Sequence, residues 1–271
     1  MALHGILGDI HGNREALAVA LERLAECRVD DLLCVGDLVG YNADGDECVA
    51  MLRARGARCI AGNHDLIGTG MLGFERCSNK AMHSLKRTRR ALAPETADYL
   101  RALPMHIVVP PLAAGARRSA ILLTHGGVRD VQQYMTQPRH IVQNARLLRE
   151  DFPAAGICFF GHTHEQRVFE VDGDAVVEVA IDGPVALRDD RIYFVNPGSV
   201  DASRKRCAKL AECAVFDDAS GALAFHRVPY DAASTEVKAS AQGYRIDRWR
   251  DRLYDVQRRV IGPRHEEGER A

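Results

Sequence analysis

The sequence contains no apolar run that approaches the roughly 18 residues needed to span a membrane. It has no excess of one charge either, since 36 Lys and Arg stand against 37 Asp and Glu, a formal net charge of −1. Such a balance provides no extended basic track for a nucleic-acid backbone. The sequence therefore gives no signal for a membrane partner and no strong signal for a nucleic-acid partner.

Paired cysteine motifs are also missing. The eight cysteines include no Cys-x-x-Cys pair, and several stand inside apolar runs such as 32–35 and 156–160. Buried, reduced thiols explain this pattern better than a disulfide framework does. The first nine residues have neither the basic start nor the long apolar stretch of a signal peptide. Together these features predict a cytoplasmic protein.

A repeated unit of strand, polar loop and helix fills the first 65 residues. Short apolar runs at 3–7, 31–35 and 57–61 alternate with helical patterns at 14–27 and 44–55. Such alternation predicts a parallel sheet covered by helices. Chemistry in such sheets gathers at the carboxyl ends of the strands, where each of these runs is followed by polar residues.

The remainder of the chain departs from this repeated unit, first in a helical stretch and then in a stretch rich in strands. Residues 66–103 show no convincing strand, and helices are expected at 78–92 and 94–103, so we interpret this stretch as a helical insertion over the site. Further strand-like runs and a helix follow as far as residue 228, which indicates an α/β fold of two packed sheets with helices outside. We predict one domain over 1–261, with C-terminal helices in 232–261 packed on its core, and a polar tail at 262–271.

Potential metal ligands follow the apolar runs. They are two carboxylates, four imidazoles and one amide: Asp9, Asp37, His11, His125, His162, His164 and Asn63. Asp9 and His11 are two residues apart, a spacing that in extended chain directs both side chains to one side. Oxygen and nitrogen ligands without thiolate favour manganese, iron, zinc or similar ions over copper. Seven ligands exceed the need of one metal and fit two metals that share a bridging carboxylate.

The order of these motifs resembles a known family. Asp-x-His at 9–11, Gly-Asp at 36–37, Gly-Asn-His-Asp at 62–65, Thr-His-Gly at 124–126 and Gly-His-Thr-His at 161–164 resemble the signature of the calcineurin-like metallophosphoesterases. The flanking text "GDLVGY", "CFFGHTH" and "YFVNPGSV" is similar to a branch of small cytoplasmic phosphodiesterases from bacteria and archaea. The resemblance covers residues 3 to about 230. It implies a four-layer αββα sandwich of two mixed β-sheets flanked by helices.

The resemblance also implies a role for each residue. Asp9, His11, Asp37 and His164 would hold one metal ion, and Asp37, Asn63, His125 and His162 would hold a second, with Asp37 bridging. A hydroxide between the ions would attack phosphorus in line. His64 would donate a proton to the leaving oxygen or stabilise the charge on the phosphoryl group, and Asp65 would orient His64 by accepting a hydrogen bond from its ring. We expect two divalent or mixed-valence ions, manganese or iron first, with zinc, nickel and magnesium as alternatives.

These roles predict a phosphodiesterase or phosphatase that acts on a nucleotide or other small phosphorylated molecule, as a monomer or small homo-oligomer. A symmetrical diadenosine polyphosphate hydrolase is the specific candidate. The alternative of another class is a non-catalytic scaffold with the same fold, which the complete ligand set disfavours.

Substrate contacts are the least defined part of the prediction. Asn63 is one candidate, and Tyr41 is another if it stacks on a base, although a packed tyrosine fits the sequence better. Arg87 or Arg90 would hold a distal phosphate of the substrate if its side chain points toward the site. The simpler interpretation is that both arginines lie on a solvated face of the helix. The chain departs from related sequences at Asp201, which places a negative charge where small residues are common.

Overall fold

Two six-stranded sheets form the centre of the protein. The computed structural model describes residues 2–110, 119–202 and 208–261. Across the first sheet the strands are β3 (Arg58–Cys59), β2 (Asp31–Cys34), β1 (Leu3–Leu7), β11 (Leu210–Asp217), β12 (Ala222–Pro229) and β9 (Val185–Ala186). Across the second they are β4 (Ile107–Val109), β5 (Ala120–Leu123), β6 (Ala155–Phe159), β10 (Ile192–Asn196), β7 (Arg167–Asp172) and β8 (Ala175–Val179).

Both sheets are mixed, as expected. The strands β1, β2 and β3 pair in parallel, and β11 joins β1 antiparallel. The strands β5, β6 and β10 pair in parallel, with antiparallel neighbours on either side. The parallel part of each sheet brings the carboxyl ends of successive strands to one edge, where the loops that carry the candidate ligands begin.

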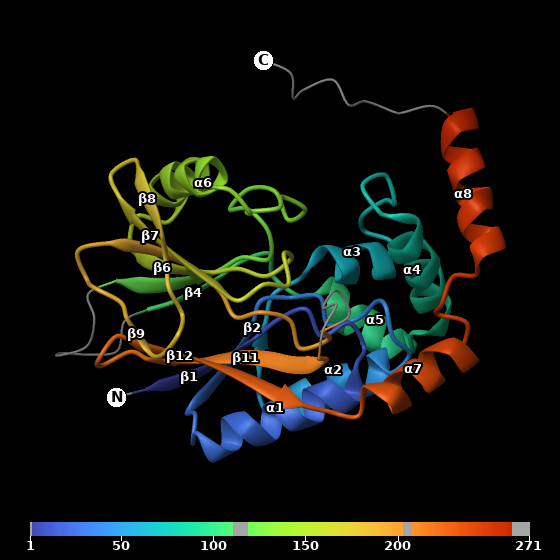
Figure 1. Cartoon of the computed structure of the whole chain (residues 1–271), viewed down its shortest axis with the longest axis horizontal. Coiled ribbons are helices and arrows are strands. Elements are labelled where there is room, and N and C mark those ends of the chain that lie inside the picture. The colour runs from blue at the N-terminus through green and yellow to red at the C-terminus, as the bar shows by residue number, and fades with distance from the viewer. Residues whose placement is uncertain (1, 111–118, 203–207, 262–271) are drawn as a thin grey trace.

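Helices cover the outer face of each sheet (Figure 1). The helices α1 (Arg14–Glu26) and α2 (Gly45–Ala54) lie below the first sheet, and α6 (Pro138–Asp151) lies above the second. Strand alternation divides the core accordingly, because Ile6 joins the cluster between the sheets while its neighbour Leu7 joins the cluster under α1 and α2. The four-layer αββα sandwich is confirmed.

Three helices form the predicted insertion at one end of the sandwich (Figure 1). They are α3 (Asn63–Thr69), α4 (Asn79–Ala91) and α5 (Pro94–Arg101). Ile67 of α3 packs against Ala81 and Leu85 of α4, in a small apolar cluster separate from the sheets. The helix α3 is absent from the sequence prediction, which treated residues 62–65 as a loop.

The C-terminal helices take two different positions. The helix α7 (Ala232–Ala241) lies against α1, whereas α8 (Arg248–Ile261) contacts α4. Asn79 of α4 donates to the side chains of Asp251 and Asp255, so polar contacts hold α8 on the insertion. The packing of both helices on the core stays a prediction, and the predicted tail at 262–271 lies outside the described residues.

Two absences predicted from the sequence can be compared with the fold. Within the described ranges, no helix combines the length and the apolar character needed to cross a membrane. Seven cysteines are described, and each is a free thiol; Cys207 lies outside the described residues.

Candidate active site

The loops after five strands meet at one end of the sandwich, and both sheets contribute. Asp9, Asp37 and Asn63 follow β1, β2 and β3 of the first sheet. His125 follows β5, and the loop with His162 follows β6, both in the second sheet. Each of these side chains is at most 5% exposed, so the centre lies between the two sheets rather than on the surface.

Left-handed backbone places most of the ligands. Asp9 and His11 both have φ of 52°, Asp37 has 57°, and His162 and His164 have 68° and 61°. Non-glycine residues rarely adopt this conformation, and each such residue costs about 1–3 kcal/mol, which the surrounding structure must offset. The predicted extended geometry for the Asp-x-His spacing is therefore wrong. A tight turn, rather than an extended chain, brings the two side chains together.

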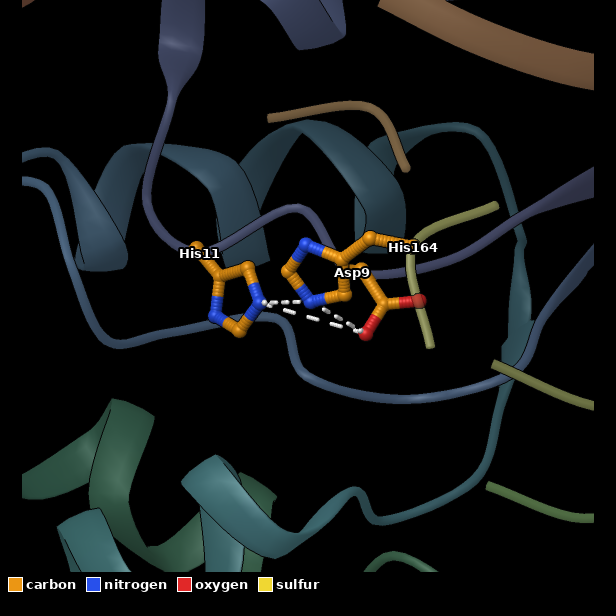
Figure 2. Close-up of side chains that lie close together, drawn as sticks. All are labelled: Asp9, His11 and His164. Atoms are coloured by element: carbon orange, nitrogen blue, oxygen red, sulfur yellow. Dashed lines mark hydrogen bonds and ion pairs between the residues drawn. The ribbon is translucent and has the colours of Figure 1, made fainter. Parts of the chain in front are cut away.

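One group of ligands comprises Asp9, His11 and His164, whose ligand atoms lie within 4.8 Å of one another. Figure 2 shows the imidazoles with their Nε2 atoms facing each other, 3.1 Å apart. The Asp9 Oδ1 atom lies 3.1 Å from Nε2 of His164 and 3.9 Å from Nε2 of His11. The other contacts of this carboxylate include the backbone N–H of His162, which binds both oxygens at 3.1 Å.

A second group comprises Asp37, His125 and His162. Nε2 of His125 lies 3.3 Å from Asp37 Oδ2 and 3.0 Å from Oδ1 of Asn63. Asp37 belongs at the same time to a third group with His11 and His64. It is the carboxylate that connects both halves of the site, as the bridging role requires.

The hydrogen bonds of the imidazoles show what the centre can hold. Nδ1 of His11 faces the carbonyl oxygen of Val39 at 3.3 Å, and Nδ1 of His125 faces that of Val35 at 2.7 Å. Since a carbonyl can only accept, Nδ1 is the donor in each ring, and a ring without a second proton presents a lone pair at Nε2. At Nε2 of His125 that lone pair faces the Asn63 Oδ1, another acceptor. Acceptors that converge in this way fit a cation between them.

The charges of the site favour cations as well. Burial alone would raise the pKa of the Asp37 carboxyl, but His125 and His64 hold it well below its usual range. Burial lowers the pKa of His125, yet the carboxylates of Asp37 and Asp9 outweigh it and raise this pKa to about 9. Two buried carboxylates thus remain ionised and attract positive charge, either as a proton on His125 or as bound metal ions.

Two glycines permit the close packing of this centre. A Cβ atom on Gly62 would lie 2.2 Å from Oδ1 of Asp37, and one on Gly40 would lie 2.3 Å from Nδ1 of His64. Gly40 also has φ of 124°, which side chains rarely tolerate. The His64 ring packs against both His11 and Tyr41, at centroid distances of 4.5 and 4.7 Å.

The Asp65 carboxylate binds backbone N–H groups of two segments, and its expected role of orienting the His64 ring stays a prediction. Its Oδ1 accepts from the backbone N–H groups of Leu38 and Val39, and its Oδ2 accepts from those of Asp37 and Gly62. These four donors fill the lone-pair positions of a carboxylate. Asp65, fully buried, therefore fixes the loop that carries Asp37 against the start of α3.

The residues predicted to contact the substrate lie in different positions relative to the centre. Asn63 lies in the centre, 3.0 Å from Nε2 of His125. Tyr41 is only 7% exposed and packs on His11, so the packed interpretation holds and little ring surface is left for a base. Arg87 is exposed and donates to the backbone oxygen of Gln242, away from the ligands. Arg90 is exposed and makes no hydrogen bond or ion pair within the described residues.

Three residues near the site were given no role in it from the sequence alone. Tyr134 stacks on the ring of His162, and Arg76 of the insertion binds the loop that carries Tyr134. Asp201 accepts from the side chains of Asn13 and Asn42 and is buried. Only Asp201 gave a signal, as a departure from related sequences; the other two lie in irregular segments without a motif.

Comparison with known proteins agrees with this geometry. The model of the calcineurin-like phosphoesterase superfamily domain matches residues 2–219. The uncharacterized protein MJ0912 of Methanocaldococcus jannaschii is 25% identical over 228 residues, which cover 83% of this chain and 87% of the relative.

Two solved structures share the fold over nearly the whole chain. The metallophosphoesterase from Sphaerobacter thermophilus has a TM-score of 0.69 and 26% identity, covering 93% of this chain and 97% of that one. The hypothetical protein PH1004 from Pyrococcus horikoshii OT3 has a TM-score of 0.67 and 18% identity, with the same coverage. The chain therefore belongs to the calcineurin-like phosphoesterase superfamily and is a metal-dependent hydrolase of phosphoric esters.

Proposed function

We propose that the chain hydrolyses a phosphoric ester of a nucleotide or other small phosphorylated molecule at a centre of two metal ions. The observation that carries this proposal is the position of Asp37, which belongs to two of the three ligand groups at once. A carboxylate shared between neighbouring groups is the arrangement expected of a centre with two ions.

The ligand groups suggest how the ions would be held. Asp9, His11 and His164 with Asp37 would bind one ion, and Asp37, Asn63, His125 and His162 would bind the other. Imidazole, carboxylate and amide donors suit manganese or iron, and zinc, nickel and magnesium are alternatives. When bound, two such ions neutralise charge on the phosphoryl group and lower the pKa of an attacking water.

His64 is the proposed proton donor to the leaving oxygen. Its backbone N–H donates to Oδ1 of Asp37 at 2.7 Å, so its ring is fixed beside the shared carboxylate. The ring also packs against His11 and Tyr41, which restricts its movement, as a general acid needs. Asp65 acts as a positioning residue, because it holds the backbone of both Asp37 and the start of α3.

Two variants test the assignment. We expect Asp37→Ala to lose at least one equivalent of bound metal and all activity on an aryl phosphodiester. We expect His64→Ala to keep both equivalents but to turn over about 10²-fold more slowly or worse. Full metal content in Asp37→Ala would contradict the shared carboxylate, and normal turnover in His64→Ala would contradict the proton donor.

The ligand set bears on the two alternatives. Seven buried side chains of metal-ligand type support the enzyme, because a binding scaffold derived from this fold would not need them. The symmetrical diadenosine polyphosphate hydrolase remains a specific candidate. A panel of dinucleoside polyphosphates, cyclic dinucleotides, aryl esters and phosphopeptides, each assayed with several divalent metals, would decide among these substrates.

A further inference from the structure

Tyr134 lies at the edge of the centre with its ring half exposed. The ring centroid lies 4.0 Å from that of His162, at an interplanar angle of 39°. His162 is 4% exposed, whereas Tyr134 is 47% exposed. One part of the tyrosine therefore covers a candidate metal ligand, and another part faces solvent directly beside the site.

The loop that carries Tyr134 is anchored on its inner side. Val128 and Met135, on either side of the tyrosine, are buried in the core cluster beneath α6. The side chain of the fully buried Asn144 accepts from the backbone N–H of Val128 at 2.7 Å. The same amide donates to Oε1 of Gln133 at 2.9 Å. Tyr134 thus lies between Val128 and Met135 in the chain, and the core holds both of these residues in place.

The helical insertion holds this loop from the opposite side. Nη1 of Arg76 donates to both carboxylate oxygens of Asp130, at 3.0 and 2.8 Å, and its Nη2 donates to the backbone oxygen of Gln132 at 3.0 Å. These contacts join the insertion to the loop at Asp130 and Gln132, four and two residues before Tyr134. The exposure of the ring is consequently a fixed feature of the mouth of the site.

An aromatic ring that is held rigidly and exposed next to a reactive centre can bind a flat ligand at little entropic cost. We propose that Tyr134 is a stacking platform for the nucleobase of the substrate, an inference that rests on the proposed function. Because this ring lies against His162, the ester substituent of a phosphoryl group bound beside His162 would lie within its reach. Tyr41, the other tyrosine of the centre, is 7% exposed and already packed between two imidazoles, so it offers no comparable surface.

The test is a binding comparison that needs no turnover. The ligands are the phosphonate analogues of AMP and of ribose 5-phosphate, in which carbon replaces the ester oxygen, so that the pair differs only in the base. Calorimetry on the manganese-loaded protein measures both dissociation constants. Stacking of a base on an aromatic side chain predicts about 5- to 150-fold tighter binding of the AMP analogue.

Variants at position 134 separate stacking from structural support. Tyr134→Phe keeps the ring and should keep the preference for the AMP analogue. Tyr134→Leu keeps apolar bulk against His162, and should bind both analogues equally while its metal content stays at the wild-type level. Equal affinities in the wild type would overturn the inference, as would a full preference in Tyr134→Leu or a loss of metal in that variant.

Failure of the proposed function would look different. Neither analogue would then bind the manganese-loaded wild type, and the base-dependent difference would have no basis at all. Loss of the base-dependent difference alone, with the ribose 5-phosphate analogue still bound, overturns only the role of Tyr134.

Discussion

Replacement of Asp65 by asparagine tests how the loop of the shared carboxylate is held. Asp65→Asn keeps the size of the side chain but replaces one acceptor oxygen by an NH2 group. In the native protein each carboxylate oxygen accepts two backbone N–H groups, at distances of 2.8–3.1 Å. The amide would still satisfy two of these donors, and its own N–H groups would face the other two.

The expected loss of stability follows from those two donors. The site is fully buried, so water cannot replace the lost acceptor. An unsatisfied buried donor costs roughly 1–3 kcal/mol, and two of them cost about 2–6 kcal/mol. That is a large part of the roughly 5–15 kcal/mol that stabilises a typical native protein.

Urea unfolding of the metal-saturated protein measures this loss, together with turnover and metal content. We expect Asp65→Asn to lower the unfolding midpoint, and to weaken metal binding because the backbone of Asp37 is no longer held. Asp98→Asn is the matched control, since Asp98 is 77% exposed in its side chain and pairs with Arg101 on the surface of α5. Its midpoint should stay near the wild-type value.

The opposite pattern would refute the reasoning. If Asp65→Asn left both stability and metal binding unchanged but lowered turnover as much as His64→Ala, the main task of Asp65 would be to orient the His64 ring.

Two further predictions concern the periphery of the site. Arg76→Ala removes the ion pair with Asp130 and should raise KM for a nucleotide ester by up to about 5-fold, because an exposed pair contributes up to about 1 kcal/mol. Arg101→Ala, which removes a surface pair within α5, should leave KM unchanged. Equal KM values in the two variants would count against a role for the Arg76–Asp130 pair. Burial raises the pKa of Glu15, but the hydrogen bonds from Lys238, from its own backbone N–H and from Thr235, together with the charge of Lys238, outweigh burial and lower this pKa overall. The stabilisation by Glu15 is therefore present above the unfolded-state pKa and lost as pH falls through the folded-state pKa. Unfolding midpoints measured between pH 6 and pH 3 should therefore fall less steeply for Glu15→Gln than for the wild type, and parallel curves would exclude this contribution.

The sequence predicted the sheets well because their signal is local. Apolar runs at the start of each repeated unit located the strands to within a few residues, because strands that are buried on both faces consist of nearly continuous apolar residues. The same runs indicated where the candidate ligands cluster, because parallel strands end at one edge.

The backbone of the centre could not be predicted in the same way. The left-handed conformation at Asp9 and His11 is unfavourable for the isolated chain and is imposed by the packing of loops from different strands. The role of Asp65 likewise depends on the approach of residues 37–39, which are 26–28 positions away in the chain. Neither a motif nor a hydrophobic period contains this information.

The division of the ligands between the two sheets has a thermodynamic consequence. Asp9, His11, Asp37 and Asn63 follow strands of the first sheet, and His125, His162 and His164 follow strands of the second. Each bound ion would therefore cross-link two layers, and occupancy at 100 times the dissociation constant would add about 2.7 kcal/mol to their common stability. The metal-loaded sandwich should open as one cooperative unit, and separation of either layer should release the ions.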